Sequence, residues 1–82
     1  MRARMRRADK AIVYEAHVKR RMNQRGISTD QVERSVRSPD QERRATREGA
    51  IRFEKRLSNR RRLAVIADEE STLIRVVTAF WM

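Results

Sequence analysis

The chain has 82 residues, which is enough for one small domain and too few for two. It carries 21 basic against 11 acidic side chains, and the formal net charge of +10 predicts a polyanionic partner such as nucleic acid. Because cysteine is absent, disulfides, thiolate nucleophiles and cysteine-ligated metals are excluded.

Residues 1–10 are expected to form a basic N-terminal arm, and residues 11–82 a single folded domain. No apolar run of the kind found in secretory signals follows the basic start. The longest apolar stretch, residues 73–82, contains Arg75 and is too short to cross a membrane. These features predict a cytoplasmic protein with no membrane partner.

Residues 11–14 are apolar and rich in β-formers, so they predict either a first strand or the lead-in to a helix. Tyr14, Val18 and Met22 recur every four positions and form one apolar stripe. This spacing predicts a helix over residues 15–25, and the glycine that follows is the residue expected directly after a helix.

A second helix is expected directly after the first. Ser28 and Gln31 have the spacing of a capping box, and Ile27 stands where a hydrophobic staple would. Pro39 ends this helix, because the residue before a proline is biased out of the α region. Together the two segments predict a helical hairpin over residues 15–38.

The apolar period changes to two in the second half of the chain. In residues 51–57, Ile51, Phe53, Lys55 and Leu57 alternate with Arg52, Glu54 and Arg56, as in a strand with one solvated face. Residues 63–67 are nearly all apolar, which predicts a central strand. Residues 72–81 predict the longest strand, and residues 41–48 an additional polar edge strand. We therefore expect an α+β fold with the helical hairpin packed on one face of a mainly antiparallel sheet of three to five strands.

On an ideal helix, His17, Arg21 and Arg25 lie along the shoulder of the apolar stripe, at the seam between helix and sheet. An imidazole can transfer protons near neutral pH, and guanidinium groups can stabilise the charge that develops on a phosphate. This row fits RNA cleavage by the RNA's own 2′-hydroxyl, with Tyr14, Glu54 or a substrate group as a second proton shuttle. A structural histidine fits the same spacing, so both interpretations stay open.

Basic side chains are concentrated in residues 1–25, with a net charge of +7, and in residues 41–62, with a net charge of +6. The side chains expected to contact nucleic acid are Arg20, Arg52, Lys55, Arg56, Arg60 and Arg61. A binding module that contacts phosphates and cuts nothing is the alternative to an enzyme. The adjacent acidic residues 68–70 predict a solvated hairpin tip rather than a magnesium site, and no metal or other cofactor is expected.

The run HVKRRMNQRGIS, residues 17–28, resembles HAxxRMxxRGIS, a pattern of the domain-of-unknown-function family 4258 of small bacterial and phage proteins. The one departure is Val18, where the pattern has alanine. Four further segments follow in matching order, so the resemblance covers residues 11–82. They are SPD at residues 38–40, RFEK at residues 52–55, RRLAVI at residues 61–66 and VVTAFW at residues 76–81.

This family is similar to the RelE- and BrnT-type toxins, whose small α+β fold is related to microbial ribonucleases such as barnase. The resemblance implies a metal-independent endoribonuclease, in some cases a toxin that a small acidic antitoxin neutralises. Its implied partners are RNA, in some cases on the ribosome, and that antitoxin, and the apolar final strand predicts an antitoxin contact or a homodimer. The catalytic residues that it implies are His17, Arg21 and Arg25 on the helix, with Arg62 and Thr78 on strands.

Overall fold

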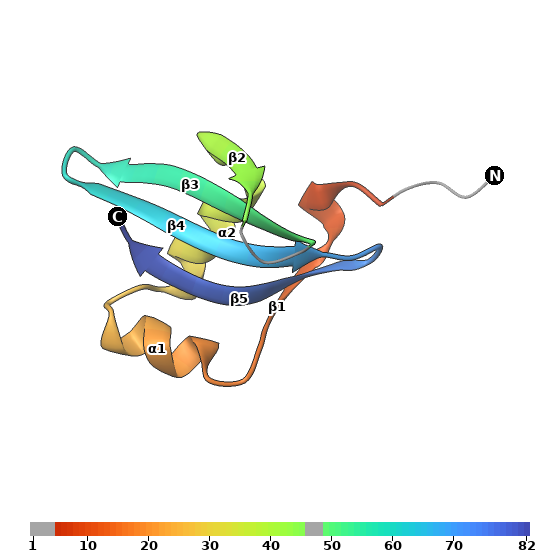
Figure 1. Ribbon diagram of the computed structural model, residues 1–82, viewed down its shortest axis with the longest axis horizontal. Helices are drawn as coiled ribbons and strands as arrows, with labels where there is room; N and C mark the ends of the chain where they lie inside the picture. Colours follow the sequence, from red (N-terminus) through yellow and green to blue (C-terminus); the bar gives the residue numbers. More distant parts are fainter. Residues whose placement is uncertain (1–4, 46–48) are drawn as a thin grey trace.

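The structure is a computed structural model that describes residues 5–45 and 49–82. Within these residues, the chain forms a short 3-10 helix at Arg7–Asp9, two α-helices and five strands (Figure 1). In chain order the elements are β1 (Ala11–Tyr14), α1 (Val18–Gln24), α2 (Thr29–Arg37), β2 (Gln41–Arg44), β3 (Ala50–Ser58), β4 (Arg61–Glu69) and β5 (Leu73–Trp81).

The five strands form one mixed sheet in the order β1-β5-β4-β3-β2. β1 runs parallel to β5, and the other three neighbouring pairs are antiparallel. The expected α+β class and the central position of the strand at residues 63–67 are confirmed, since β4 is the middle strand. Residues 11–14 are a strand, and the expected polar edge strand is confirmed over β2. The end of that prediction, residues 46–48, lies outside the described residues.

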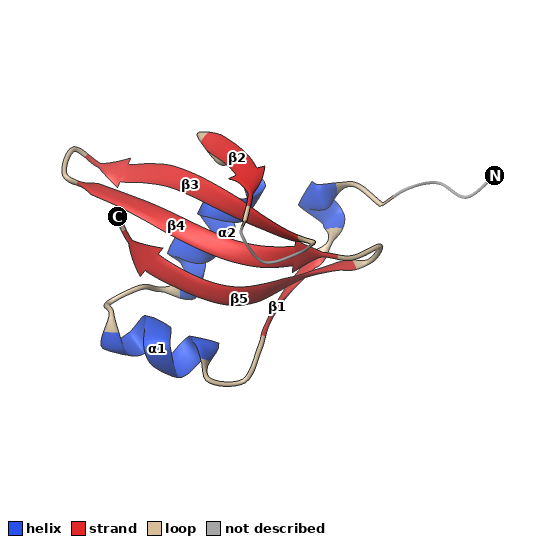
Figure 2. Cartoon of the chain, in the orientation of Figure 1, coloured by secondary structure: helices blue, strands red, loops and turns tan. Residues whose placement is uncertain are grey.

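The two α-helices place their apolar side chains in one core against the same face of the sheet. Val18 and Met22 of α1, with Val32 and Val36 of α2, belong to a single buried cluster. The strand residues of that cluster are Phe53, Leu63, Val65, Ala67, Ile74, Val76 and Ala79. α2 lies behind the sheet in Figure 2, and the opposite face of β3, β4 and β5 carries no helix of the described chain.

Helix α1 begins three residues later than the spacing predicts, so the expected start at residue 15 is wrong. The backbone N–H of Glu15 still bonds to the carbonyl of Val76, at 3.0 Å, so the chain is still paired with β5 there. His17 then has a φ of 78°, in the left-handed region. Gly26 follows α1 with a φ of 68°, and the N–H of the next residue bonds to the carbonyl of Met22, a Schellman closure.

Helix α2 follows its predicted signals. The Ser28 hydroxyl accepts a bond from the Gln31 N–H, and the Gln31 side chain accepts one from the Ser28 N–H, which is the capping box. The helix ends at Arg37, with Ser38 as its C-cap directly before Pro39. Among the described residues, no helix is both long and apolar enough to cross a membrane.

The expected basic arm, residues 1–10, is partly described, and its second half contacts the domain. Arg7 forms ion pairs with Glu42 of β2 and Glu69 of β4. Lys10 Nζ lies 2.9 Å from Glu69 Oε2, and the Arg37 guanidinium donates to backbone carbonyls of this segment. The segment therefore connects β2, β4 and the end of α2.

Candidate functional site

The face of the sheet without a helix, called the open face below, carries rows of directly opposed residues, three of which surround Glu54; a further row, Ala50, Asp68 and Arg75, lies beyond them. Facing side chains of paired strands point to the same side of the sheet, and successive rows are about 6.6 Å apart. The first row is Arg43, Arg52, Ile66 and Thr78; the second is Gln41, Glu54, Ala64 and Phe80; the third is Arg56 and Arg62.

Glu54 is a buried carboxylate at the centre of the open face, and its residue is only 1% exposed. Arg52 Nε donates to Glu54 Oε2 at 2.7 Å, and Arg43 Nε lies 3.4 Å from the same oxygen. Arg62 Nη2 lies 3.5 Å from Glu54 Oε1. Oε1 accepts no hydrogen bond from any described residue, although a buried charge normally uses all of its acceptors.

The three arginines around Glu54 are held to different degrees. The Arg52 guanidinium also lies over the Phe80 ring, 5.2 Å from its centroid, so this group is fixed from two sides. The side chains of Arg43 and Arg62 are 58% and 42% exposed, and each approaches Glu54 at one longer distance. They are therefore accessible to a second anion, whereas Arg52 is already oriented.

The third row places two like charges opposite each other. Arg56 of β3 faces Arg62 of β4, an arrangement that destabilises a sheet unless an anion lies between or beside the two groups. Arg62 shares the Glu54 carboxylate with two other arginines. The described part of the open face thus concentrates more positive than negative charge, which suits the phosphates of a nucleic acid.

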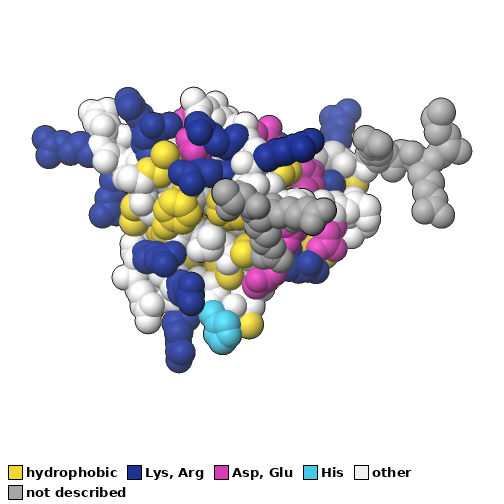
Figure 3. All heavy atoms as spheres, in the orientation of Figure 1, with side chains coloured by type: hydrophobic (Ala, Val, Ile, Leu, Met, Phe, Trp, Pro, Cys, Tyr) yellow, Lys and Arg dark blue, Asp and Glu magenta, His cyan; other side chains and the backbone are white. Residues whose placement is uncertain are grey.

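A β-bulge shapes the other end of the open face. Ile66 pairs with Thr78 and the next residue of β4 pairs with Val76, so Val77 is an extra residue in β5. A pocket of about 560 Å³ lies here. Its lining residues are Arg43, Arg44, Ala45, Arg52, Ile66, Val77 and Thr78. Figure 3 shows this side of the molecule, with hydrophobic atoms near its centre, basic side chains mainly above and to the left of them, and acidic side chains to the right.

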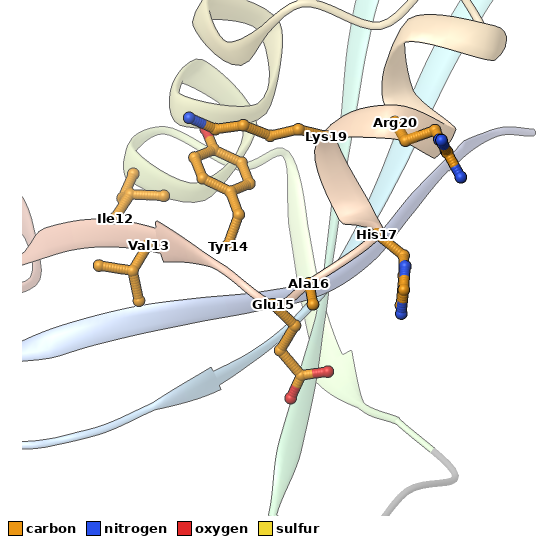
Figure 4. A pocket seen from close by; sticks show the side chains of 8 residues that line it. All are labelled: Ile12, Val13, Tyr14, Glu15, Ala16, His17, Lys19 and Arg20. Carbon is orange, nitrogen blue, oxygen red and sulfur yellow. The ribbon is translucent and has the colours of Figure 1, made fainter.

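His17 is at a different location, at the start of α1. Its left-handed φ places it outside the helix and its side chain caps nothing, so the predicted helical row of His17, Arg21 and Arg25 is wrong. The exposed imidazole lines a depression of about 590 Å³ together with Arg20 (Figure 4). In that view Lys19 extends over the Tyr14 ring, with its Nζ 5.2 Å from the ring centroid.

Tyr14 belongs to the helix-covered side of the sheet, where it packs against the core. Its hydroxyl is buried and has no partner among the described residues, and burial, with a smaller contribution from Glu33, raises the pKa of the phenol. Of the two protein groups expected as a second proton shuttle, Glu54 therefore lies on the open face and Tyr14 does not.

Arg25 has a structural role that its position at the end of α1 explains. Its Nη1 donates to the carbonyl of Ala79 at 2.8 Å, and its own carbonyl accepts from Trp81 Nε1 at 2.7 Å. These bonds attach the end of α1 to the part of β5 that β1 does not cover. The predicted catalytic residues thus separate into two groups, with Arg62 and Thr78 on the open face and His17, Arg21 and Arg25 around α1.

The residues expected to contact nucleic acid are also divided. Arg52 and Arg56 are on the open face, and Arg60 lies in the turn between β3 and β4. Lys55 points to the other side, where its Nζ donates to the Ser38 carbonyl at 2.6 Å. Arg61 stacks on the Trp81 ring on that side as well, 4.4 Å from the centroid, and Arg20 is next to His17.

The family model described as "Domain of unknown function (DUF4258)" matches residues 14–81. The chain belongs to the DUF4258 family. The match includes the three rows around Glu54 as well as the run at residues 17–28. No match was found for the chain among curated proteins or among solved structures.

Two members of the open-face site of this DUF4258 protein were not assigned to it from the sequence. Glu54 appeared only as one of three alternatives for a proton shuttle, and Arg43 was not singled out. The available signal was that Arg52, Glu54 and Arg56 occupy alternate positions of one strand and therefore share one face of the sheet. Three charged residues in this pattern predict a solvated face, and only the register with β2 and β4 shows that Glu54 is enclosed.

Proposed function

We propose that this protein is a metal-independent endoribonuclease whose active site is the open face of the sheet. The observation that carries the proposal is the Glu54 carboxylate, which is buried, surrounded by three arginines, and has one oxygen without a hydrogen-bond donor among the described residues. A buried carboxylate with an oxygen that accepts no hydrogen bond from a described residue can accept a proton from a substrate group within hydrogen-bond reach.

In the proposed reaction, Glu54 accepts the proton of a ribose 2′-hydroxyl, and the 2′-oxygen attacks the adjacent phosphorus. The bond from phosphorus to the 5′-oxygen breaks, the departing oxygen takes a proton from water, and the hydroxide left behind takes the proton from Glu54. The products are a 2′,3′-cyclic phosphate and a 5′-hydroxyl. The substrate carries its own nucleophile, so the protein has to supply only a base and positive charge.

The arginines supply that charge. Arg52 is held in place by Glu54 and Phe80, so it needs little reorganisation as negative charge develops on the phosphate. Arg62 and Arg43 are more exposed and reach the same carboxylate from two neighbouring strands. The Thr78 hydroxyl lies in the first row, where it can donate to a phosphate or a base edge.

The order of elements supports a closer assignment of the fold and biology. α1 and α2 precede four strands, β2 to β5, which are joined by three antiparallel pairs, and the two helices pack into one core. This order supports the proposal of a RelE- or barnase-like ribonuclease fold. We include in the proposal the toxin role implied by that likeness. In this role the protein acts in the cytoplasm on free or ribosome-bound RNA, with a small acidic antitoxin or a second copy as its protein partner.

One observation favours a second function, a basic module that binds nucleic acid without cutting it. Glu54 Oε2 is already occupied by Arg52 and Arg43, so the carboxylate also serves to hold these side chains in position. In that case Glu54 organises a phosphate-binding surface and takes no proton from the substrate.

The two functions differ in what Glu54→Gln does. We would incubate a mixed RNA with each protein in excess EDTA and analyse the ends of the fragments. If the protein is an enzyme, the parent protein should cleave the RNA and leave 2′,3′-cyclic phosphate ends. The cleavage rate of Glu54→Gln should then be at least about 10²-fold lower, which is the usual contribution of a general base. Glu70→Gln is the matched control, because that carboxylate is exposed and forms an ion pair with Arg75, whose row lies two rows from Glu54 along the strands.

His17→Asn tests the site that the sequence predicted. Asparagine tolerates the left-handed backbone at this position, so the variant removes the imidazole with little strain. Unchanged cleavage by His17→Asn places the active site on the open face. Loss of cleavage in His17→Asn with normal cleavage in Glu54→Gln would move it to α1. RNA retention without cleavage by any of the proteins would establish the binding module.

A further inference from the structure

The pocket at the end of the first row differs from the rest of the open face in its chemistry. Ile66 and Val77 give it an apolar part, while Arg52 and Arg43 stand beside them with their guanidinium groups. A phosphate would use the arginines and gain nothing from the two aliphatic side chains. A nucleobase has flat apolar faces and polar edges, so it would use both.

We propose that this pocket binds one unstacked base and makes the protein selective for single-stranded nucleic acid. The inference rests on the proposed function of the open face as an RNA site. Flat guanidinium groups and aromatic rings are the usual platforms on which proteins stack bases that have left a helix. Duplex bases are stacked on both sides and cannot enter a pocket without leaving the helix.

Arg52 is the platform, because it is already oriented before any ligand binds. Its Nε is held by Glu54 Oε2 at 2.7 Å, and its guanidinium is stacked on Phe80 at 5.2 Å from the ring centroid. A base that stacks on the outer side of this group extends an existing stack. Little side-chain entropy is lost on binding, since the side chain is ordered in the free protein.

The bulge in β5 completes the pocket and supplies specific contacts. Because Val77 is an extra residue, it lies beside Thr78 at the wall of the pocket instead of pairing with β4. Thr78 adds a hydroxyl that can donate to or accept from a base edge. The pocket shares Arg43 and Arg52 with the Glu54 site, so a base held there places its own ribose and phosphate next to the carboxylate.

Arg56 and Arg62, two rows further along the strands, continue the path for the backbone. Their backbones are about 13 Å from the first row, on the strand spacing of two rows. Arg62 reaches back to Glu54, whereas Arg56 contacts a neighbouring phosphate and not the bound base. This division of roles gives the test its control. A change in the pocket should affect single strands, whereas a change at Arg56 should affect every polyanion alike.

The experiment measures binding by fluorescence anisotropy at one fixed salt concentration, with a 12-nucleotide RNA that carries 2′-fluoro groups in place of the 2′-hydroxyls. Such a strand cannot supply the nucleophile, so binding is observed independently of cleavage. The same sequence is used as a single strand, as a duplex with its complement, and as a single strand with abasic sites. We expect the normal single strand to bind at least about tenfold more tightly than the duplex or the abasic strand.

Two variants address the pocket itself. Arg52→Lys keeps the charge and removes the flat platform, and Ile66→Trp fills the apolar part. Each variant should reduce the affinity for the normal single strand by about tenfold. The affinity for the abasic strand should stay within about twofold of the value for the parent protein. Arg56→Lys is the control, and it should change the affinity for each of the three RNA ligands by the same small factor. Circular dichroism spectra and unfolding midpoints verify that each variant is folded.

Equal affinity for the single strand and the duplex would overturn the proposal. Equal losses of affinity for the normal and the abasic strand in both pocket variants would overturn it as well. These outcomes are separate from the failure of the proposed function. RNA cleavage that depends on Glu54 with no preference for single strands would reject only the base pocket. A pocket-dependent preference for single strands without cleavage would reject only the enzyme.

Discussion

Glu69 is predicted to hold the N-terminal segment on the domain, and Glu69→Gln tests this. Its carboxylate accepts from Arg7 Nη2 at 2.9 Å, Arg7 Nε at 3.3 Å and Lys10 Nζ at 2.9 Å, and the Glu69 side chain is 21% exposed. Hydrogen bonds to charged groups contribute about 1.5–3 kcal/mol each in favourable settings, and solvent screening reduces the sum here. We expect Glu69→Gln to lower the free energy of unfolding by about 2 kcal/mol at pH 7.

The hydrogen bond from Arg7 is the main reason that the pKa of Glu69 is lowered from its ordinary value of 4.5, with Lys10 adding to the shift. A group with a lowered pKa in the folded state stabilises the fold fully above the unfolded pKa, and this stabilisation is lost as the pH falls through the folded pKa. The difference between the parent and Glu69→Gln should therefore be complete above the ordinary pKa of 4.5, and it should shrink as the pH falls through the lowered pKa of the folded state.

Urea unfolding followed by circular dichroism at several pH values measures this difference. At pH 7 a loss of 2 kcal/mol corresponds to a drop of roughly 10 °C in the melting temperature of a domain of this size. Glu70→Gln is the control, because Glu70 and Arg75 are each about 40% exposed and such a pair contributes at most about 1 kcal/mol. The reasoning would be refuted if Glu69→Gln lowered the free energy of unfolding by the same amount at pH 2 and at pH 7.

Three further stability predictions and one binding prediction use the same unfolding and anisotropy assays. Phe53→Ala should cost about 3–5 kcal/mol, because this ring is fully buried in the core. Ser28→Ala should cost about 1 kcal/mol, and Ser28→Asp should restore most of it as an N-cap. His17→Gly should stabilise the fold by about 1 kcal/mol, because glycine adopts its φ of 78° without strain. Arg56→Gln should reduce the salt dependence of RNA binding by about one phosphate contact.

The elements that were predicted correctly have signals that are local in the sequence. The capping box at Ser28 and the stop at Pro39 each act within a few residues, and the period of two marks β3 without knowledge of its neighbours. The continuous apolar run in β4 predicted its central position, because such a run must be covered on both faces.

The start of α1 was not predictable in the same way. A helix starting at residue 15 satisfied the spacing of Tyr14, Val18 and Met22, but the parallel pairing of β1 with β5 extends to the N–H of Glu15. The chain then has to turn before the helix can begin, and His17 adopts the left-handed conformation in this turn. The tertiary pairing overrode the local spacing, and this moved the histidine out of the helix.

Glu69 shows the same limit in a different element. Its position beside two other acidic residues predicted a solvated hairpin tip, yet it lies in β4 and bonds to Arg7 and Lys10. The two partners are 62 and 59 residues away in the sequence. No local pattern predicts such a contact, because it depends on where the N-terminal segment meets the sheet.

The Glu54 site required the register of four strands. The carboxylate is enclosed because four strands contribute to its surroundings. Phe80 lies in the same row as Glu54, Arg43 and Arg52 lie in the row on one side, and Arg62 lies in the row on the other side. A buried charge of this kind is costly, and an apolar residue at the same place on a sheet would often be equally or more stabilising. The stability of the fold therefore does not explain why a carboxylate is enclosed by arginines on the face that no helix covers. Each of the two proposed roles, proton transfer and the orientation of phosphate-binding arginines, would account for it, and the Glu54→Gln assay separates them.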